Sequence, residues 1–147
     1  MYFDKANAAQ RSMAESNVFA SVRSLHYGLA LIAAGRIEEA SQVAREALEL
    51  AQDGGNRSSE AGAYGLLGEV AMRRDPVDHA EMERYVRNCL ALADELEMRP
   101  LTARCHLRLA WLYKIEGRCE HERHTATAML LLEQMGNPRT PDASGLH

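Results

Sequence analysis

The stretch from Leu25 to Asn56, LHYGLALIAAGRIEEASQVAREALELAQDGGN, holds two helix-forming segments with a Gly35-Arg36 turn between them. Glycine has no Cβ and readily adopts the left-handed backbone that ends many helices, so Gly35 is expected to end the first one. The second segment carries apolar residues at spacings of three and four, typical of one buried helix face: Ala40, Val43, Ala44, Ala47, Leu48 and Ala51. The stretch therefore predicts a helix, a tight turn and a second helix.

The same pattern occurs twice more, in YGLLGEVAMRRD from Tyr64 and LRLAWLYKIEGR from Leu107. A small residue recurs at intervals of 40 and then 42 residues, at Gly28, Gly68 and Ala110. A turn-forming residue follows seven positions later in each unit, at Gly35, Asp75 and Gly117. Asp75 precedes a proline, which disfavours helix in the residue before it. We expect the small residue to let the two helices of a pair approach closely.

These intervals predict a helical-repeat domain over residues 1–136. Its parts are a half-repeat at 4–16 and full repeats at about 21–54, 61–97 and 103–135. Asn56 or Ser58 is expected to cap the next helix, and Pro100 fits a first helical turn. The short linkers predict antiparallel neighbours. The tail 137–147 is rich in Gly, Pro and polar residues and is expected to be disordered, and the half-repeat favours a fragment of a longer chain.

These residues resemble the tetratricopeptide repeat family, whose signature combines Trp, Leu-Gly, Tyr, Ala, Phe and Pro at fixed offsets. The resemblance runs from about Ser21 to Met135 and is carried by Tyr27-Gly28, Leu67-Gly68, Leu109-Ala110 and Tyr113. The signature Pro is absent and the period exceeds the usual length of about 34 residues. The longer period is more similar to arrays in bacterial multidomain regulators of the adenylate cyclase, ATPase or maltose-regulator type. The resemblance implies an all-α, right-handed superhelical stack of antiparallel helix pairs.

The resemblance also implies a concave groove, lined by the first helix of each pair, that binds a protein or peptide. The first repeat would supply Val22, Leu25, Leu29 and Ile32, and the second would begin with Gly65. The residues expected to contact an acidic or amphipathic peptide are Glu69, Met72, Arg73, Arg104, Leu107, Trp111 and Lys114. Trp111 would be an aromatic anchor, and the basic residues would donate to carboxylates. In the alternative interpretation Trp111 is core and the arginines are solvated.

Charge and composition disfavour other classes of partner. The net charge is −4 and no basic block occurs, so nucleic acid is not an expected partner. The start MYFDKANAAQ does not resemble a secretory signal, and apolar runs such as Ala128–Leu132 are too short for a bilayer. We therefore expect a cytoplasmic protein without a membrane partner. Three cysteines without a CxxC pair favour reduced thiols, with Cys89 and Cys105 in the core.

No arrangement of residues in the sequence predicts catalysis, a cofactor or a metal. The segment CEHERH places Cys119, His121 and His124 together, but a structural zinc site needs four ligands. The glycines of GLLGE lie inside a helical pattern rather than after a strand, unlike those of a phosphate-binding loop. The leading hypothesis is a non-catalytic protein-interaction scaffold. The alternative is a ligand- or peptide-sensing regulatory module, and AMLLLEQM, from Ala128, is a candidate for homodimerisation through the terminal helices.

Overall fold

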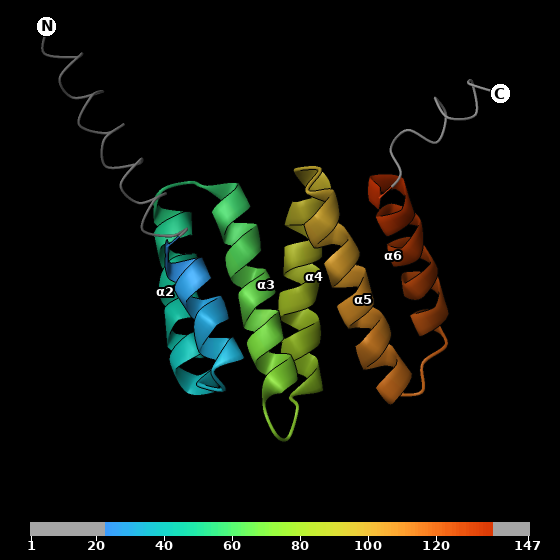
Figure 1. Cartoon of the computed structure of the whole chain (residues 1–147), viewed down its shortest axis with the longest axis horizontal. Coiled ribbons are helices and arrows are strands. Elements are labelled where there is room, and N and C mark those ends of the chain that lie inside the picture. The colour runs from blue at the N-terminus through green and yellow to red at the C-terminus, as the bar shows by residue number, and fades with distance from the viewer. Residues whose placement is uncertain (1–22, 137–147) are drawn as a thin grey trace, which may run out of the picture.

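The computed structural model describes residues 23–136, and this part of the chain is helical without any strand (Figure 1). Residues 23–33 form a helix, and five further helices of 17 residues each follow. They are α2 (Ile37–Asp53), α3 (Arg57–Arg73), α4 (His79–Glu95), α5 (Arg99–Ile115) and α6 (Glu120–Gly136). The all-helical prediction is confirmed. The predicted half-repeat 4–16 and the tail 137–147 lie outside the described residues.

Each helix packs against its neighbours along the chain, so that α2 to α6 form a row (Figure 1). The pairs are residues 23–33 with α2, α3 with α4, and α5 with α6. Helix α3 begins at Arg57 and α5 at Arg99, four residues before the predicted starts of their repeats. Both starts agree with the expected cap at Asn56 and the expected first turn at Pro100, which lie before those repeat bounds.

Four of the turns share one hydrogen-bonding pattern, in which a backbone N–H bonds the carbonyl oxygen five residues earlier. The N–H of Arg36 donates to Leu31 at 2.8 Å and that of Arg118 to Tyr113 at 2.8 Å. The preceding residues, Gly35 and Gly117, have φ angles of 80° and 71°, which confirms both predicted helix ends. The other two turns of this kind are centred on Gly55 and Glu97.

Some other starts and ends of helices also follow from single residues. The Asn56 side chain caps α3 by accepting from the Ser59 N–H at 3.2 Å, and Pro100 lies in the first turn of α5, as predicted. Helix α3 ends at Arg73, shortly before the cis Asp75–Pro76 bond. The Asp78 side chain then caps α4, accepting from the Glu81 N–H at 3.0 Å.

Two clusters of buried side chains form the core. One joins residues 23–33, α2 and α3, and includes Leu31, Ile32, Ala40, Ala44, Leu66, Leu67 and Val70. The other joins α3, α4 and α5, and includes Ala71, Met82, Val86, Cys89, Cys105, Leu109, Leu112 and Tyr113. Both predicted core cysteines are thus confirmed. Helix α3 contributes to both clusters and therefore links the first pair to the other two.

The repeated small residues serve two different contacts. A Cβ on Gly68 would lie 2.8 Å from Cγ2 of Val86, so Gly68 does bring α3 close to α4 within its own pair. A Cβ on Gly28 would instead meet Leu66 of the following pair. The expectation of close approach within a pair is therefore correct for Gly68, whereas Gly28 permits one pair to stack on the next.

Candidate functional site

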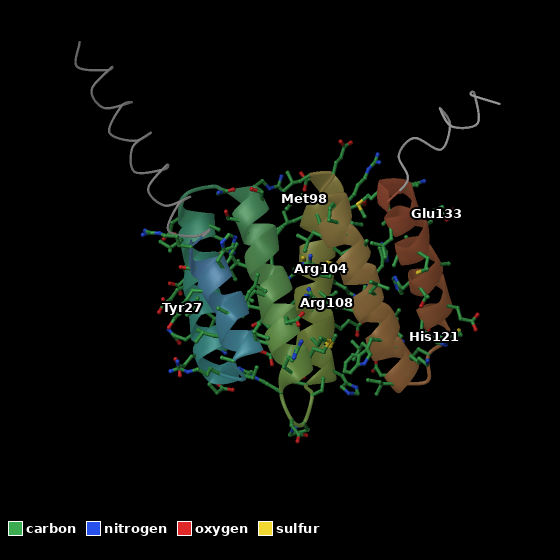
Figure 2. All side chains as sticks on the ribbon, in the orientation of Figure 1. Tyr27, Met98, Arg104, Arg108, His121 and Glu133 are labelled. Carbon is green, nitrogen blue, oxygen red and sulfur yellow. The ribbon has the colours of Figure 1, made fainter. Side chains whose placement is uncertain are left out.

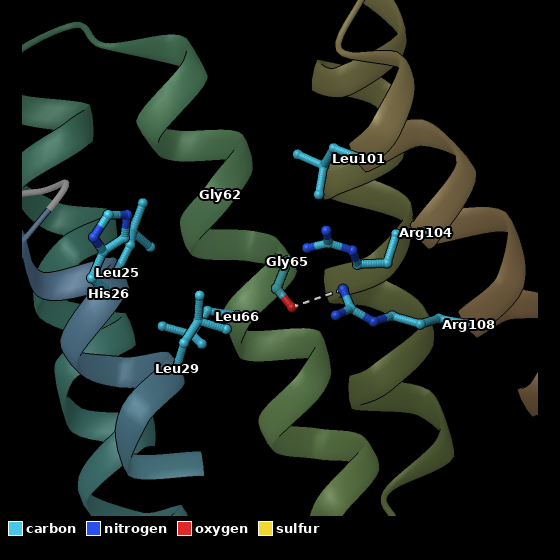
Figure 3. A pocket seen from close by; sticks show the side chains of 9 residues that line it. All are labelled: Leu25, His26, Leu29, Gly62, Gly65, Leu66, Leu101, Arg104 and Arg108. Carbon is cyan, nitrogen blue, oxygen red and sulfur yellow. Dashed lines mark hydrogen bonds between the residues drawn. The ribbon is translucent and has the colours of Figure 1, made fainter. Parts of the chain in front are cut away.

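A cavity of about 200 Å³ lies where the first helices of the three pairs come together, and we call it the three-helix groove (Figure 3). Residues 23–33, α3 and α5 each contribute three lining residues. These are Leu25, His26, Leu29, Gly62, Gly65, Leu66, Leu101, Arg104 and Arg108. The lining is therefore mainly apolar, with two guanidinium groups on the α5 side.

The groove has its depth because α3 presents glycines there. A Cβ on Gly62 would lie 2.9 Å from Cδ1 of Leu25, on the neighbouring first helix. A Cβ on Gly65 would lie 3.3 Å from Sγ of Cys89 and 3.5 Å from Cδ1 of Leu101. The α3 backbone can therefore form the bottom of the groove, with the leucines of the adjacent helices as its walls.

Arg108 is held in place at one side of the groove. Its guanidinium donates to the carbonyl oxygen of Gly65 at 3.2 Å, drawn as the dashed line in Figure 3, and to the carboxylate of Glu69. The Glu69 carboxylate also bonds Arg73, at 3.2 Å. Only 11% of the Arg108 side chain is exposed, so its charge is largely withdrawn from solvent and neutralised by Glu69.

Arg104, one turn earlier on α5, is in a different situation (Figure 2). Its side chain extends from α5 toward α3 (Figure 3), and it is exposed. It forms no ion pair or hydrogen bond with any other residue of the described range 23–136. The groove thus has one compensated guanidinium and one that is available to a negatively charged ligand.

The space behind Gly65 contains two buried thiols, Cys89 and Cys105. The hydrogen bond between them, followed by burial, raises the pKa of the Cys89 thiol far above its usual range. Cys89 is therefore protonated at neutral pH and adds no negative charge beneath the groove.

The seven predicted site residues do not share one surface. Arg104 alone lines the three-helix groove, while Glu69 is engaged with Arg108 and Arg73. Met72 is half-buried against the second core cluster. The other three predicted residues, all on α5, line a different hollow: Leu107, Trp111 and Lys114. Arg108 was missed, although its spacing of four residues from Arg104 is a signal for one helix face.

The second hollow, which we call the α5–α6 face, measures about 530 Å³. Helix α5 contributes Leu107, Ala110, Trp111 and Lys114, and α6 contributes His121, Glu122, Thr125 and Ala126. Leu107 and Trp111 are each 40% exposed. Trp111 is thus neither a fully buried core residue nor part of the three-helix groove.

A pair of histidines joins α5 to α6 behind this face. Nδ1 of His106 lies 2.9 Å from Nδ1 of His124, and the rings stack with centroids 5.1 Å apart. The Tyr113 ring packs against His124, and its hydroxyl donates to Glu83 at 2.6 Å. Burial lowers the pKa of both histidines, and the charge of His106 lowers that of His124 further. The pair therefore favours neutral imidazoles.

The segment with zinc-like spacing does not form a cluster. His124 is turned into the contact with His106, while Cys119 is exposed. Among residues 23–136, no three or more His, Cys, Asp or Glu side chains are grouped so that they could hold a metal ion. None of the helices in this range has the length and apolar character needed to cross a membrane.

Comparison of the chain with protein-family models, with curated proteins and with solved structures gave no match.

Proposed function

We propose that this chain is a non-catalytic scaffold of the tetratricopeptide type, a right-handed superhelical stack of antiparallel helix pairs. It binds an acidic or amphipathic segment of a partner protein in the three-helix groove. The observation that carries this proposal is the available guanidinium of Arg104 beside an apolar cavity that spans all three pairs.

The groove is matched to an apolar side chain next to a carboxylate. Leu25, Leu29 and Leu101 provide the apolar walls. Arg104 can donate two parallel hydrogen bonds to a carboxylate, which adds geometric selectivity to charge attraction. Arg108 already bonds Glu69, so it shapes the groove without attracting a second acidic group.

The size of the cavity favours the scaffold over the ligand-sensing module. A volume of about 200 Å³ is below the roughly 300–1,000 Å³ typical of small-molecule sites. A cavity of this size can accept part of a peptide while the rest lies along the surface. This is the way extended repeat surfaces bind their partners.

The proposal is tested with peptides selected from a random displayed library against the wild-type chain. Binding of the selected peptides to the wild type, to Arg104→Glu and to Arg45→Glu is then measured by fluorescence anisotropy. Arg45 is an exposed arginine on α2 away from the groove, so it is a matched control for the change in charge.

We expect selected peptides to place an Asp, a Glu or the terminal carboxylate beside an apolar residue. Arg104→Glu should weaken them by roughly 10- to 100-fold, because a hydrogen bond to a charged group contributes about 1.5–3 kcal/mol. Arg45→Glu should bind like the wild type. Equal binding by all three proteins, or loss in both variants, would show that the groove is not the site.

A further inference from the structure

The three pairs present equivalent faces to whatever follows them in the stack. Aligning the repeats at Gly28, Gly68 and Ala110 places four first-helix positions in register. In the last pair these positions are Leu107, Ala110, Trp111 and Lys114, all of which line the α5–α6 face. The same face can therefore be compared in the two preceding pairs, where a following helix is present.

In the first pair α3 covers part of this face, while Leu29, the counterpart of Trp111, stays 50% exposed. Leu25 and Gly28 are the counterparts of Leu107 and Ala110, and they contact Gly62 and Leu66 of α3 respectively. Leu107, in contrast, is 40% exposed.

In the second pair the face is covered by α5. Gly65, the counterpart of Leu107, is buried against Leu101 and Arg108. Met72, the counterpart of Lys114, packs against the cluster that α5 completes. In the last pair, no helix of the described range 23–136 covers the face, which leaves an apolar hollow.

Helix α6 shows the same difference. Leu48, Leu90 and Leu132 occupy one position in the second helices, at intervals of 42 residues. Leu48 and Leu90 are half-buried against the two core clusters, whereas Leu132 is 43% exposed. Leu107 on α5 and Leu132 on α6 are thus exposed at positions that a neighbour covers in the preceding pairs.

Two segments of the chain are poor occupants of this face. The helix 23–33 of another copy would place Arg23 at the position of Ala63 and Cys105, which are fully buried. Burying that charge without a partner is strongly unfavourable. The tail sequence contains Pro138, Pro141 and only one large apolar residue, Leu146, which is too little apolar surface to fill this face.

The rim of the α5–α6 face carries one charge of each sign. Lys114 lies in the last turn of α5 and Glu122 in the first turn of α6, on either side of the turn at residues 116–119. Neither side chain forms an ion pair or hydrogen bond with another residue of the described range. A face with an apolar centre and one charge of each sign is complementary to itself, as a two-fold interface requires.

We propose that the α5–α6 face binds the same face of a second copy about a two-fold axis. Each α5 then packs on α6 of the other copy, and Leu107 and Trp111 are buried at the centre. Lys114 of each copy pairs with Glu122 of the other at the rim. This dimer leaves the three-helix groove open, so it is independent of the peptide-binding proposal.

The test is the mass of the full chain, measured by sedimentation equilibrium over a range of concentrations. The wild type should approach twice its 16.3 kDa as concentration rises. Lys114→Glu and Glu122→Lys should each raise the dimer dissociation constant roughly tenfold or more. Each substitution puts two like charges opposite each other at both ends of the two-fold interface. An equimolar mixture of the two variants should restore dimerisation, because opposite charges then face each other at both ends.

Glu46→Lys on α2 and Arg104→Glu serve as controls, and both should dimerise like the wild type. Circular dichroism verifies that every variant keeps its helicity. A wild type that stays monomeric overturns the proposal. So does a dimer that both rim variants leave intact, since another surface then joins the copies. The proposal is also overturned if Lys114→Glu and Glu122→Lys each weaken dimerisation but their equimolar mixture stays monomeric, because the charge pairing is then wrong.

Discussion

Helices α4 and α6 are the second helices of consecutive pairs, yet they are buried to very different extents. In α4 the core-facing residues are completely buried: Met82, Val86, Cys89 and Ala93. At the same positions 42 residues later, α6 carries two buried residues, His124 and Ala128, and two half-buried ones, Leu131 and Met135. Helix α4 packs against α3 and α5, whereas α6 contacts α5 alone among the described helices. The stability of a repeat thus depends on having neighbours on both sides.

The largest effect is expected when a residue of the well-covered interior, Leu109 on α5, is compared with one on α6, through Leu109→Ala and Leu130→Ala. Leu109 is fully buried where α5 meets α4, and Leu130 is 56% exposed on α6. We expect the free energy of unfolding to fall by about 2–5 kcal/mol for Leu109→Ala, because a buried cavity remains. Leu130→Ala should change it by less than about 0.5 kcal/mol. Urea unfolding followed by circular dichroism measures both, and similar losses would contradict the burial difference.

The repeat architecture could be predicted from sequence because local signals determine it. Gly35 and Gly117 mark helix ends, and Asn56 and Pro100 mark helix starts, through the conformations of single residues. Such signals do not depend on what packs above or below a repeat.

The candidate site could be predicted only in part, because its residues are assigned to a surface by packing between repeats. Arg104 was found because the tetratricopeptide resemblance places it on the groove side of a first helix. Leu107, Trp111 and Lys114 share its helix but line a face that no other helix of residues 23–136 covers. The contact of His106 with His124 joins two helices and leaves no local pattern in the sequence.

The histidine pair lets pH act on the less covered end of the molecule. Burial lowers the pKa of both His106 and His124, and the charge of Arg123 lowers both pKa values further. Arg87 and Arg118 also lower the pKa of His124, while Asp94 raises that of His106. The unfolded chain therefore binds more protons than the folded one below an unfolded-state pKa of about 6.5. The contribution of this pair to the free energy of unfolding is therefore fully present above that pH. It is lost as the pH falls through the lowered pKa values of the two histidines in the folded chain.

We accordingly expect the urea midpoint to decrease when the pH is lowered from 7.5 to 5.5. The decrease should be smaller in His106→Gln, since one of the two shifted groups is then absent. Amide exchange should show α6 losing protection before α4. A midpoint that is constant over this range would contradict the lowered pKa values.

The smallest expected effect lies in the turn that connects α4 to α5. Glu97 has a φ of 56°, whereas the residues in the same position of the three equivalent turns are Gly35, Gly55 and Gly117. The left-handed conformation costs a residue with a Cβ roughly 1–2 kcal/mol, and the added freedom of glycine in the unfolded chain offsets part of this. Glu97 is exposed, and its side chain makes no hydrogen bond or ion pair within residues 23–136.

Glu97→Gly should therefore raise the free energy of unfolding by about 0.5–1 kcal/mol. The matched control, Gly55→Ala in the turn before α3, should lower it by about 1 kcal/mol, because it introduces the same strain where none exists. Urea unfolding measures both changes. Because Glu97 joins the well-covered α4 to the last pair, the gain should appear as slower amide exchange in α5 as well as in α4. A gain confined to α4 would mean that the last pair opens independently of the turn, and that α4 and α6 differ in cooperativity as well as in burial.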